Sequence, residues 1–147
     1  MKNILTGLYN FWYFRKVVWN FRWWDYTYNL RLFQESLKYT ARELELKGTH
    51  GSVKEDAADI RNVIRLLEKV KSDKFIEDAE RIVGYELKGF DFEETEINGK
   101  PVYRLVDKPD TDKEKSREVC RLSDELEENN WNMIWDEIKS KMRRWWD

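Results

Sequence analysis

The chain has 147 residues, a length that predicts a single domain (residues 1–147) able to bury a core without disulfide bonds. One cysteine and one histidine exclude an internal disulfide bond and a zinc site built from this chain alone. Residues 1–47 carry eight Lys or Arg against four Asp or Glu, whereas residues 48–147 carry nineteen against twenty-five. With a net charge of −2, this balance argues against duplex nucleic acid as a partner but suits a small anionic ligand.

Residues 1–47 are predicted to form aromatic N-terminal helices, because 13 of the chain's 22 aromatic residues fall in residues 1–39. The first helix, residues 4–19, is apolar nearly all round, which is typical of a helix buried in the core or against a second subunit. Its apolar run is too short for a transmembrane segment, which takes about 20 residues. The second helix is expected to start after an N-cap at Asp25 and to stop at Gly48. Its apolar stripe comprises Leu30, Phe33, Leu37, Ala41 and Leu44.

Residues 52–84 are predicted to form a helical hairpin. The sequence from Ser52 to Glu55 has the pattern of a capping box, in which the serine and the glutamate satisfy each other's backbone donors. A second cap at Ser72 and Asp73 precedes a shorter helix that is expected to end at Gly84. Acidic residues such as Asp56 and Asp59 are expected on the outer, solvated side of the first of these helices.

Residues 85–106 are predicted to form a β-hairpin, with its strands around residues 90–106, because Asn98-Gly99 suits a turn that needs two positive φ angles. A capping box from Thr111 to Glu114 introduces the C-terminal helix, residues 111–143. The final residues, 143–147, hold two tryptophans, so we expect this tail to be ordered and packed against the first helix or a neighbouring subunit. The fold class is therefore mainly α, with four to five helices and one β-hairpin.

The run of residues 11–31 interleaves aromatic rings with arginines. A ring can stack on a base and a guanidinium can hold a phosphate, so this pattern suits a nucleotide pocket. Adjacent Trp23 and Trp24 cannot both point inward from one helix, so one of them should face a pocket, a partner or solvent. A second Arg/Trp cluster closes the chain. The predicted ligand-binding residues are Arg15, Arg22, Trp23, Trp24, Tyr26, Tyr28, Asn29, Arg31 and Arg144.

Two other readings of the same residues remain open. In the first, every ring is core or interface of a structural or protein-interaction oligomer, and the arginines affect stability alone. In the second, residues 1–24 lie at a membrane surface, with tryptophan and tyrosine at the headgroup level. No P-loop, no G-x-G-x-x-G and no E-x-x-H pair is present, so we expect no enzyme, no catalytic residues, no metal site and no cofactor.

Residues 11–26 and 29–37, together with the Trp-Trp-Asp ending, resemble small proteins of tailed bacteriophages, and the likeness spans most of the chain. Proteins of this kind include anti-defence factors, some of them oligomeric sponges for cyclic nucleotide immune signals. The resemblance therefore implies a homo-oligomer in the cytoplasm of an infected bacterial cell, which sequesters a cyclic nucleotide without cleaving it. It supplies no site residues of its own.

Overall fold

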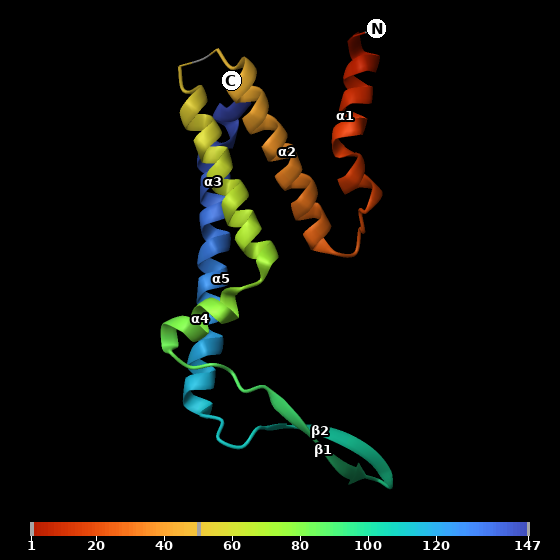
Figure 1. Cartoon of the computed structure of the whole chain (residues 1–147), viewed down its shortest axis with the longest axis vertical. Helices are drawn as coiled ribbons and strands as arrows, with labels where there is room; N and C mark the ends of the chain where they lie inside the picture. Colours follow the sequence, from red (N-terminus) through yellow and green to blue (C-terminus); the bar gives the residue numbers. More distant parts are fainter. Residues whose placement is uncertain (1, 50, 147) are drawn as a thin grey trace. The chain divides into compact units, whose positions relative to one another are not determined.

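The computed structural model describes residues 2–49 and 51–146. In this part of the chain, five α-helices and one two-stranded antiparallel sheet confirm the mainly α class with one β-hairpin (Figure 1). A short 3-10 helix, η1, closes the chain. The elements are α1 (Lys2–Trp19), α2 (Tyr26–Lys47), α3 (Val53–Ser72), α4 (Phe75–Val83), β1 (Phe90–Ile97), β2 (Lys100–Asp107), α5 (Lys113–Lys141) and η1 (Met142–Trp146).

Three of the predicted helix ends are confirmed. Asp25 caps α2 by accepting a hydrogen bond from the amide of Thr27, and α2 ends where the Gly48 amide donates to the Leu44 carbonyl at 2.8 Å. Helix α4 ends at Gly84, whose φ of +71° lies in the left-handed region that glycine adopts without strain.

The predicted caps of the other helices are corrected. Helix α3 continues through Ser72, and α4 starts after Lys74, which makes no side-chain capping bond. Asp112 caps α5, because its Oδ1 accepts from the amides of residues 114 and 115, both at 3.1 Å. The Thr111 hydroxyl instead donates to the carbonyl of residue 108, so the cap lies one residue later than predicted, and the residue three positions after it is a lysine, which cannot complete a capping box. At the start of α3, the Ser52 hydroxyl donates to Asp56 Oδ2 at 2.7 Å.

The chain divides into two compact units. The first comprises Met1–Ser72 and Asn130–Asp147, and the second comprises Asp73–Asn129. Helix α5 contributes residues 113–129 to the second unit and residues 130–141 to the first.

In the first unit, α2 lies between α1 and α3 (Figure 1). The C-terminal part of α5 runs beside α3, where the Asn130 amide donates to the Leu66 carbonyl at 3.1 Å. The predicted stripe of α2 is partly confirmed, since Leu37 and Ala41 are buried whereas Leu30, Phe33 and Leu44 are half-buried. The core side chains of this unit include Leu37, Ala41, Ala57, Ile60, Val63, Ile64, Leu66, Leu67, Val70, Ile134 and Trp145.

In the second unit, Phe75 and Ala79 of α4 are buried together with Val119 of α5. The hairpin turn is confirmed, since Asn98 has a φ of +54° and Gly99 has a φ of +74°. The pairs run from Ile97 opposite Lys100 at the turn to Phe90 opposite Asp107 at the open end. The strands leave their side chains exposed, apart from half-buried Val106.

Helix α1 is only partly buried within this chain, so of the two expected forms of burial, packing against a second subunit stays a prediction. One face of the helix packs on α2, but the opposite face carries seven large apolar side chains that are 57–89% exposed. The reason is geometric: within residues 2–49 and 51–146, α1 touches one other helix, and one neighbour covers only one side of a helix that is apolar all round.

Candidate binding site

Asp25 fixes the start of α2 and therefore the positions of the predicted site residues that follow it. Its Oδ1 accepts from the Thr27 amide at 2.9 Å and from the Thr27 hydroxyl at 2.7 Å. These bonds, and then the positive charges of Arg31 and Arg22, lower the pKa of the Asp25 carboxyl below its ordinary value. The cap places Tyr26, Tyr28, Asn29 and Arg31 on the first two turns of α2.

The interleaved arginines and rings form local pairs. The Arg15 guanidinium carbon lies 3.7 Å from the Trp12 ring centre, that of Arg31 lies 5.2 Å from the Tyr28 ring and that of Arg22 lies 5.9 Å from the Trp24 ring. The first two pairs are three residues apart on a helix, a spacing that puts both side chains on one face. Each predicted arginine in this run therefore meets an aromatic ring, as cation–π attraction favours.

Trp23 and Trp24 both face solvent in the linker before α2. Their exposed fractions are 79% and 66%, and their rings meet edge to face at 5.8 Å and 89°. Tyr26 and Asn29 are exposed as well, whereas Tyr28 is half-buried. Among the described residues, none between residues 20 and 29 belongs to the core of the first unit.

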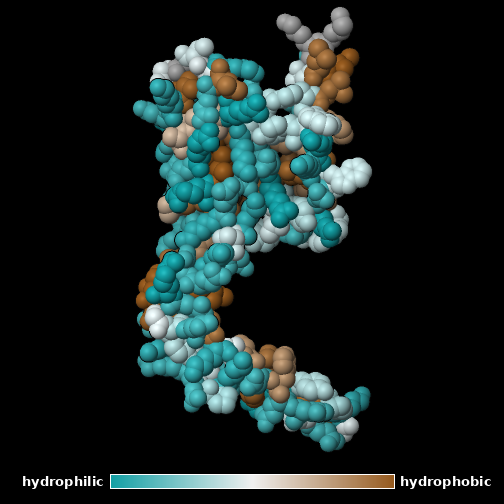
Figure 2. Space-filling view, in the orientation of Figure 1, coloured by the Kyte–Doolittle hydropathy of each residue, from teal (hydrophilic) through white to brown (hydrophobic). Residues whose placement is uncertain are grey.

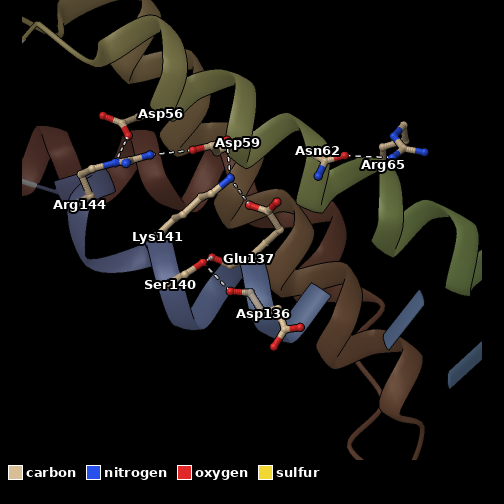
Figure 3. A network of polar contacts seen from close by, with 9 residues as sticks. All are labelled: Asp56, Asp59, Asn62, Arg65, Asp136, Glu137, Ser140, Lys141 and Arg144. Carbon is tan, nitrogen blue, oxygen red and sulfur yellow. Dashed lines mark hydrogen bonds and ion pairs between the residues drawn. The ribbon is translucent and has the colours of Figure 1, made fainter. Parts of the chain in front are cut away.

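Arg144 is the predicted site residue that the structure places elsewhere. Its Nε donates to Asp56 Oδ1 and its Nη2 to Asp59 Oδ2, both at 2.7 Å (Figure 3). Lys141 joins the same cluster, since its Nζ lies 2.9 Å from Asp59 and 2.6 Å from Glu137. These carboxylates raise the pKa of Lys141 above its ordinary value. The expectation that Asp56 and Asp59 face outward is wrong, because both turn toward the C-terminal segment.

The C-terminal segment, residues 142–146, forms η1 and packs on α3 through this cluster, not on α1 as one of the predictions had it; residue 147 lies outside the described residues. Trp145 is 1% exposed and belongs to the core of the first unit. Asp56 is fully buried, and a buried carboxylate needs a charged or hydrogen-bonding partner, which Arg144 supplies. Arg144 therefore has a structural task, and the structure does not bring it to the rings of residues 11–31.

The outward face of α1 carries an apolar surface, which we call the outer stripe and which Arg15 interrupts between Trp12 and Val18. Its residues recur at helical spacing: Ile4, Leu5, Leu8, Phe11, Trp12, Val18 and Trp19. Figure 2 shows brown and nearly white side chains along α1, whereas the visible surface of α2 and α3 is mostly teal.

The inner face of α1 packs around one tyrosine of α2. The Tyr39 ring lies 5.1 Å from Tyr13, 6.2 Å from Tyr9 and 6.3 Å from Phe14. Burial, helped by the negative charge of Glu35, raises the pKa of Tyr13. These ring contacts hold α1 against α2 and aim the outer stripe away from it.

A polar group between α2 and α3 was missed in the sequence. Gln34 is 1% exposed, and its Nε2 donates to Glu68 Oε1 at 3.0 Å and to the Ile64 carbonyl at 3.4 Å. Its Oε1 accepts from Lys71 Nζ at 2.8 Å. The signal was present, because Gln34 lies three residues before Leu37 and seven before Ala41, on the core face of α2.

No helix among the described residues is long and apolar enough to cross a membrane, and no group of three His, Cys, Asp or Glu side chains among them could hold a metal ion. An open hollow of about 440 Å³ in the second unit is lined by residues that include Phe90, Arg104, Asp107 and Lys113. None of the predicted ligand-binding residues lines it.

Comparisons with protein-family models, with curated proteins and with solved structures found no significant match to this chain.

Proposed function

We propose that this chain is a binding protein that self-associates through the outer stripe of α1. The observation that carries the proposal is the exposure of seven large apolar side chains on one helix face, with Trp19 at 89%. Single exposed apolar residues are common on soluble proteins, but several along one helix face mark an interaction surface. A second copy of the chain offers the same stripe, and an isologous contact would cover both at once.

The area of the stripe supports this occupant. The rings of Phe11, Trp12 and Trp19 alone expose on the order of 500 Å². That is already comparable with the largest apolar patch of a typical monomer, about 300–600 Å². With the four aliphatic side chains added, the stripe approaches the roughly 800 Å² per partner of a standard interface. Arg15 lies within the stripe, where its guanidinium stacks over the Trp12 ring and donates to the Trp12 carbonyl.

Sedimentation equilibrium at micromolar concentration tests the proposal. The unaltered chain should sediment as a dimer or higher oligomer, and Trp12→Glu combined with Trp19→Glu should sediment as a monomer of 18.1 kDa. The matched control is Ile82→Glu, which places a charge on an exposed apolar residue of α4 and should leave the mass unchanged. A monomeric unaltered chain would contradict the proposal, and its binding to anionic vesicles would assign the stripe to a membrane surface.

A second candidate function is the capture of a phosphorylated nucleotide. It is favoured by two arginines, Arg22 and Arg31, which are exposed beside Trp24 and Tyr28 and make no ion pair with a carboxylate within the described residues. Ring and guanidinium together suit a base and its phosphate. Under the bacteriophage resemblance, the ligand is a cyclic nucleotide immune signal, sequestered intact by an oligomer in the host cytoplasm.

Mixing the protein with a panel of cyclic dinucleotides tests this second candidate. Binding should quench or shift tryptophan fluorescence, since Trp24 lies beside Arg22, and the ligand should be recovered unchanged after denaturation. Arg22→Gln should weaken binding while the melting temperature of the free protein stays the same. Hydrolysed ligand would move the protein to the enzymes, and no binding to any member would remove the candidate.

A further inference from the structure

Two cations lie near the Gln34 side chain, where α2 packs on α3. Arg31 comes three residues before Gln34 on α2, a spacing that puts both on one face, and Lys71 donates to the Gln34 side chain. Arg31 lies on α2 and Lys71 on α3, and both are exposed. A third cation, Lys38, is ion-paired, because its Nζ lies 3.0 Å from Glu35 and 3.9 Å from Glu68. Within the described residues, neither Arg31 nor Lys71 has a carboxylate within ion-pair distance.

Lys71 is held in place by a buried amide. Its Nζ donates to Gln34 Oε1 at 2.8 Å, and the amide cannot turn away because its nitrogen donates to Glu68 and to the Ile64 carbonyl. Gln34 is 1% exposed, so the core itself fixes the direction of this bond. The ammonium is therefore anchored to a neutral oxygen and keeps its other two donors for a ligand.

The charges around Lys71 do not balance. Burial, then the positive charges of Arg31 and Lys38, lower the pKa of Lys71, and the negative charges of Glu68 and Glu35 offset this effect only in part. Repulsion between these positive charges destabilises the free protein, and a bound anion would relieve it. A guanidinium and an ammonium on neighbouring helices also bind a phosphate from two directions.

We propose that Arg31 and Lys71, with Lys71 positioned by Gln34, form a phosphate-binding site at the α2–α3 junction. The site depends on the nucleotide-capture candidate and deepens it, since Tyr28 beside Arg31 offers a ring for the base. It takes the phosphate group of a nucleotide, with the Arg31 fork and the free Lys71 donors on its oxygens. It also adds Lys71 and Gln34 to a site that the sequence placed within residues 11–31 and at Arg144.

Isothermal titration calorimetry at low salt tests the site with two probes, inorganic pyrophosphate and a cyclic dinucleotide. Arg31→Gln and Lys71→Gln should each weaken pyrophosphate binding about tenfold or more, because each removes charge-assisted hydrogen bonds. The control is Lys54→Gln, which removes an exposed lysine from the first turn of α3 and should bind as the unaltered chain does. As a second measurement, the pKa of Lys71 followed by NMR should rise when pyrophosphate binds.

The outcomes separate this site from the function it depends on. Pyrophosphate binding that requires Arg31 and Lys71, without any dinucleotide binding, would support the site and defeat nucleotide capture. Dinucleotide binding that Lys71→Gln and Arg31→Gln leave unchanged would overturn the site and keep the capture. An unaltered chain that binds neither probe at millimolar concentration would overturn both.

Discussion

Trp145 and Trp19 are the same residue type in opposite surroundings. Trp145 is 1% exposed in the core of the first unit, whereas Trp19 is 89% exposed at the end of α1. Arg144, next to Trp145 in the sequence, contributes to the packing of the C-terminal segment, because it pairs with fully buried Asp56. Residues 144 and 145 therefore stabilise the fold where η1 packs on α3.

Replacing these two tryptophans should have unequal effects on stability. Trp145→Ala should lower the free energy of unfolding by about 3–5 kcal/mol, since it leaves a cavity in the core. Trp19→Ala should change it by less than about 0.5 kcal/mol when measured on the monomer. Urea unfolding followed by circular dichroism provides both values. Equal losses in the two variants would show that the tail is not part of the core.

Asp25 should make the stability of α2 depend on pH. Its pKa is lowered in the folded chain, so ionised Asp25 stabilises the fold above its ordinary pKa of 3.8, and this gain is lost as the pH falls through the folded value. Asp25→Asn still caps the helix but does not titrate. The unaltered chain should therefore have a higher melting temperature than the variant near neutral pH, and this difference should disappear in acid. A difference in melting temperature that does not change with pH would contradict a role for the Asp25 charge.

At the scale of elements, local signals in the sequence predicted most of the secondary structure. Gly48, Gly84 and the Asn98-Gly99 turn lie where the structure uses them, because each acts through its own backbone. The errors came from tertiary contacts. The local pattern predicts Asp56 on the surface, but its partner Arg144 is far along the chain and bonds to it only in the folded structure. Gln34 is a polar residue that is ordinarily expected at the surface, and its burial depends on the partners that Lys71 and Glu68 supply from α3.

The candidate site was less predictable than the fold. The pairing of arginines with rings followed from spacing along a helix, so Arg15 and Arg31 could be linked to their neighbours in advance. Lys71 could not, because its place beside Arg31 depends on how α3 packs against α2. Whether a ring faces solvent or the core also depends on packing, and the exposure of the α1 stripe follows from its having a single neighbour.

The two turn positions of the hairpin give an element-scale prediction. Gly99→Ala introduces a Cβ at a φ of +74° and should destabilise the hairpin by about 1 kcal/mol. NMR should show weaker cross-strand contacts between Ile97 and Lys100, with the helices unchanged. The comparison variant Gly7→Ala lies in open space on α1 and should increase helix content instead. An intact hairpin in Gly99→Ala would show that the turn tolerates a side chain there.

One copy of the chain leaves the outer stripe of α1 uncovered, and a second copy would cover it. In an isologous pair, a residue near the middle of the stripe comes close to its own copy, whichever way the two helices run. Phe11 is such a residue. The chain's one natural thiol, Cys120, is exposed and must be removed from the experiment.

Disulfide crosslinking tests the pairing of α1 most directly. Phe11→Cys in a Cys120→Ser background should form a covalent dimer rapidly on mild oxidation at micromolar concentration, because paired stripes bring the two sulfurs within bonding reach. Ala58→Cys in the same background, an exposed position on α3, measures the rate of random collision. A dimer that forms much faster through residue 11 than through residue 58 is the result we predict. Equal rates would contradict self-association through the outer stripe.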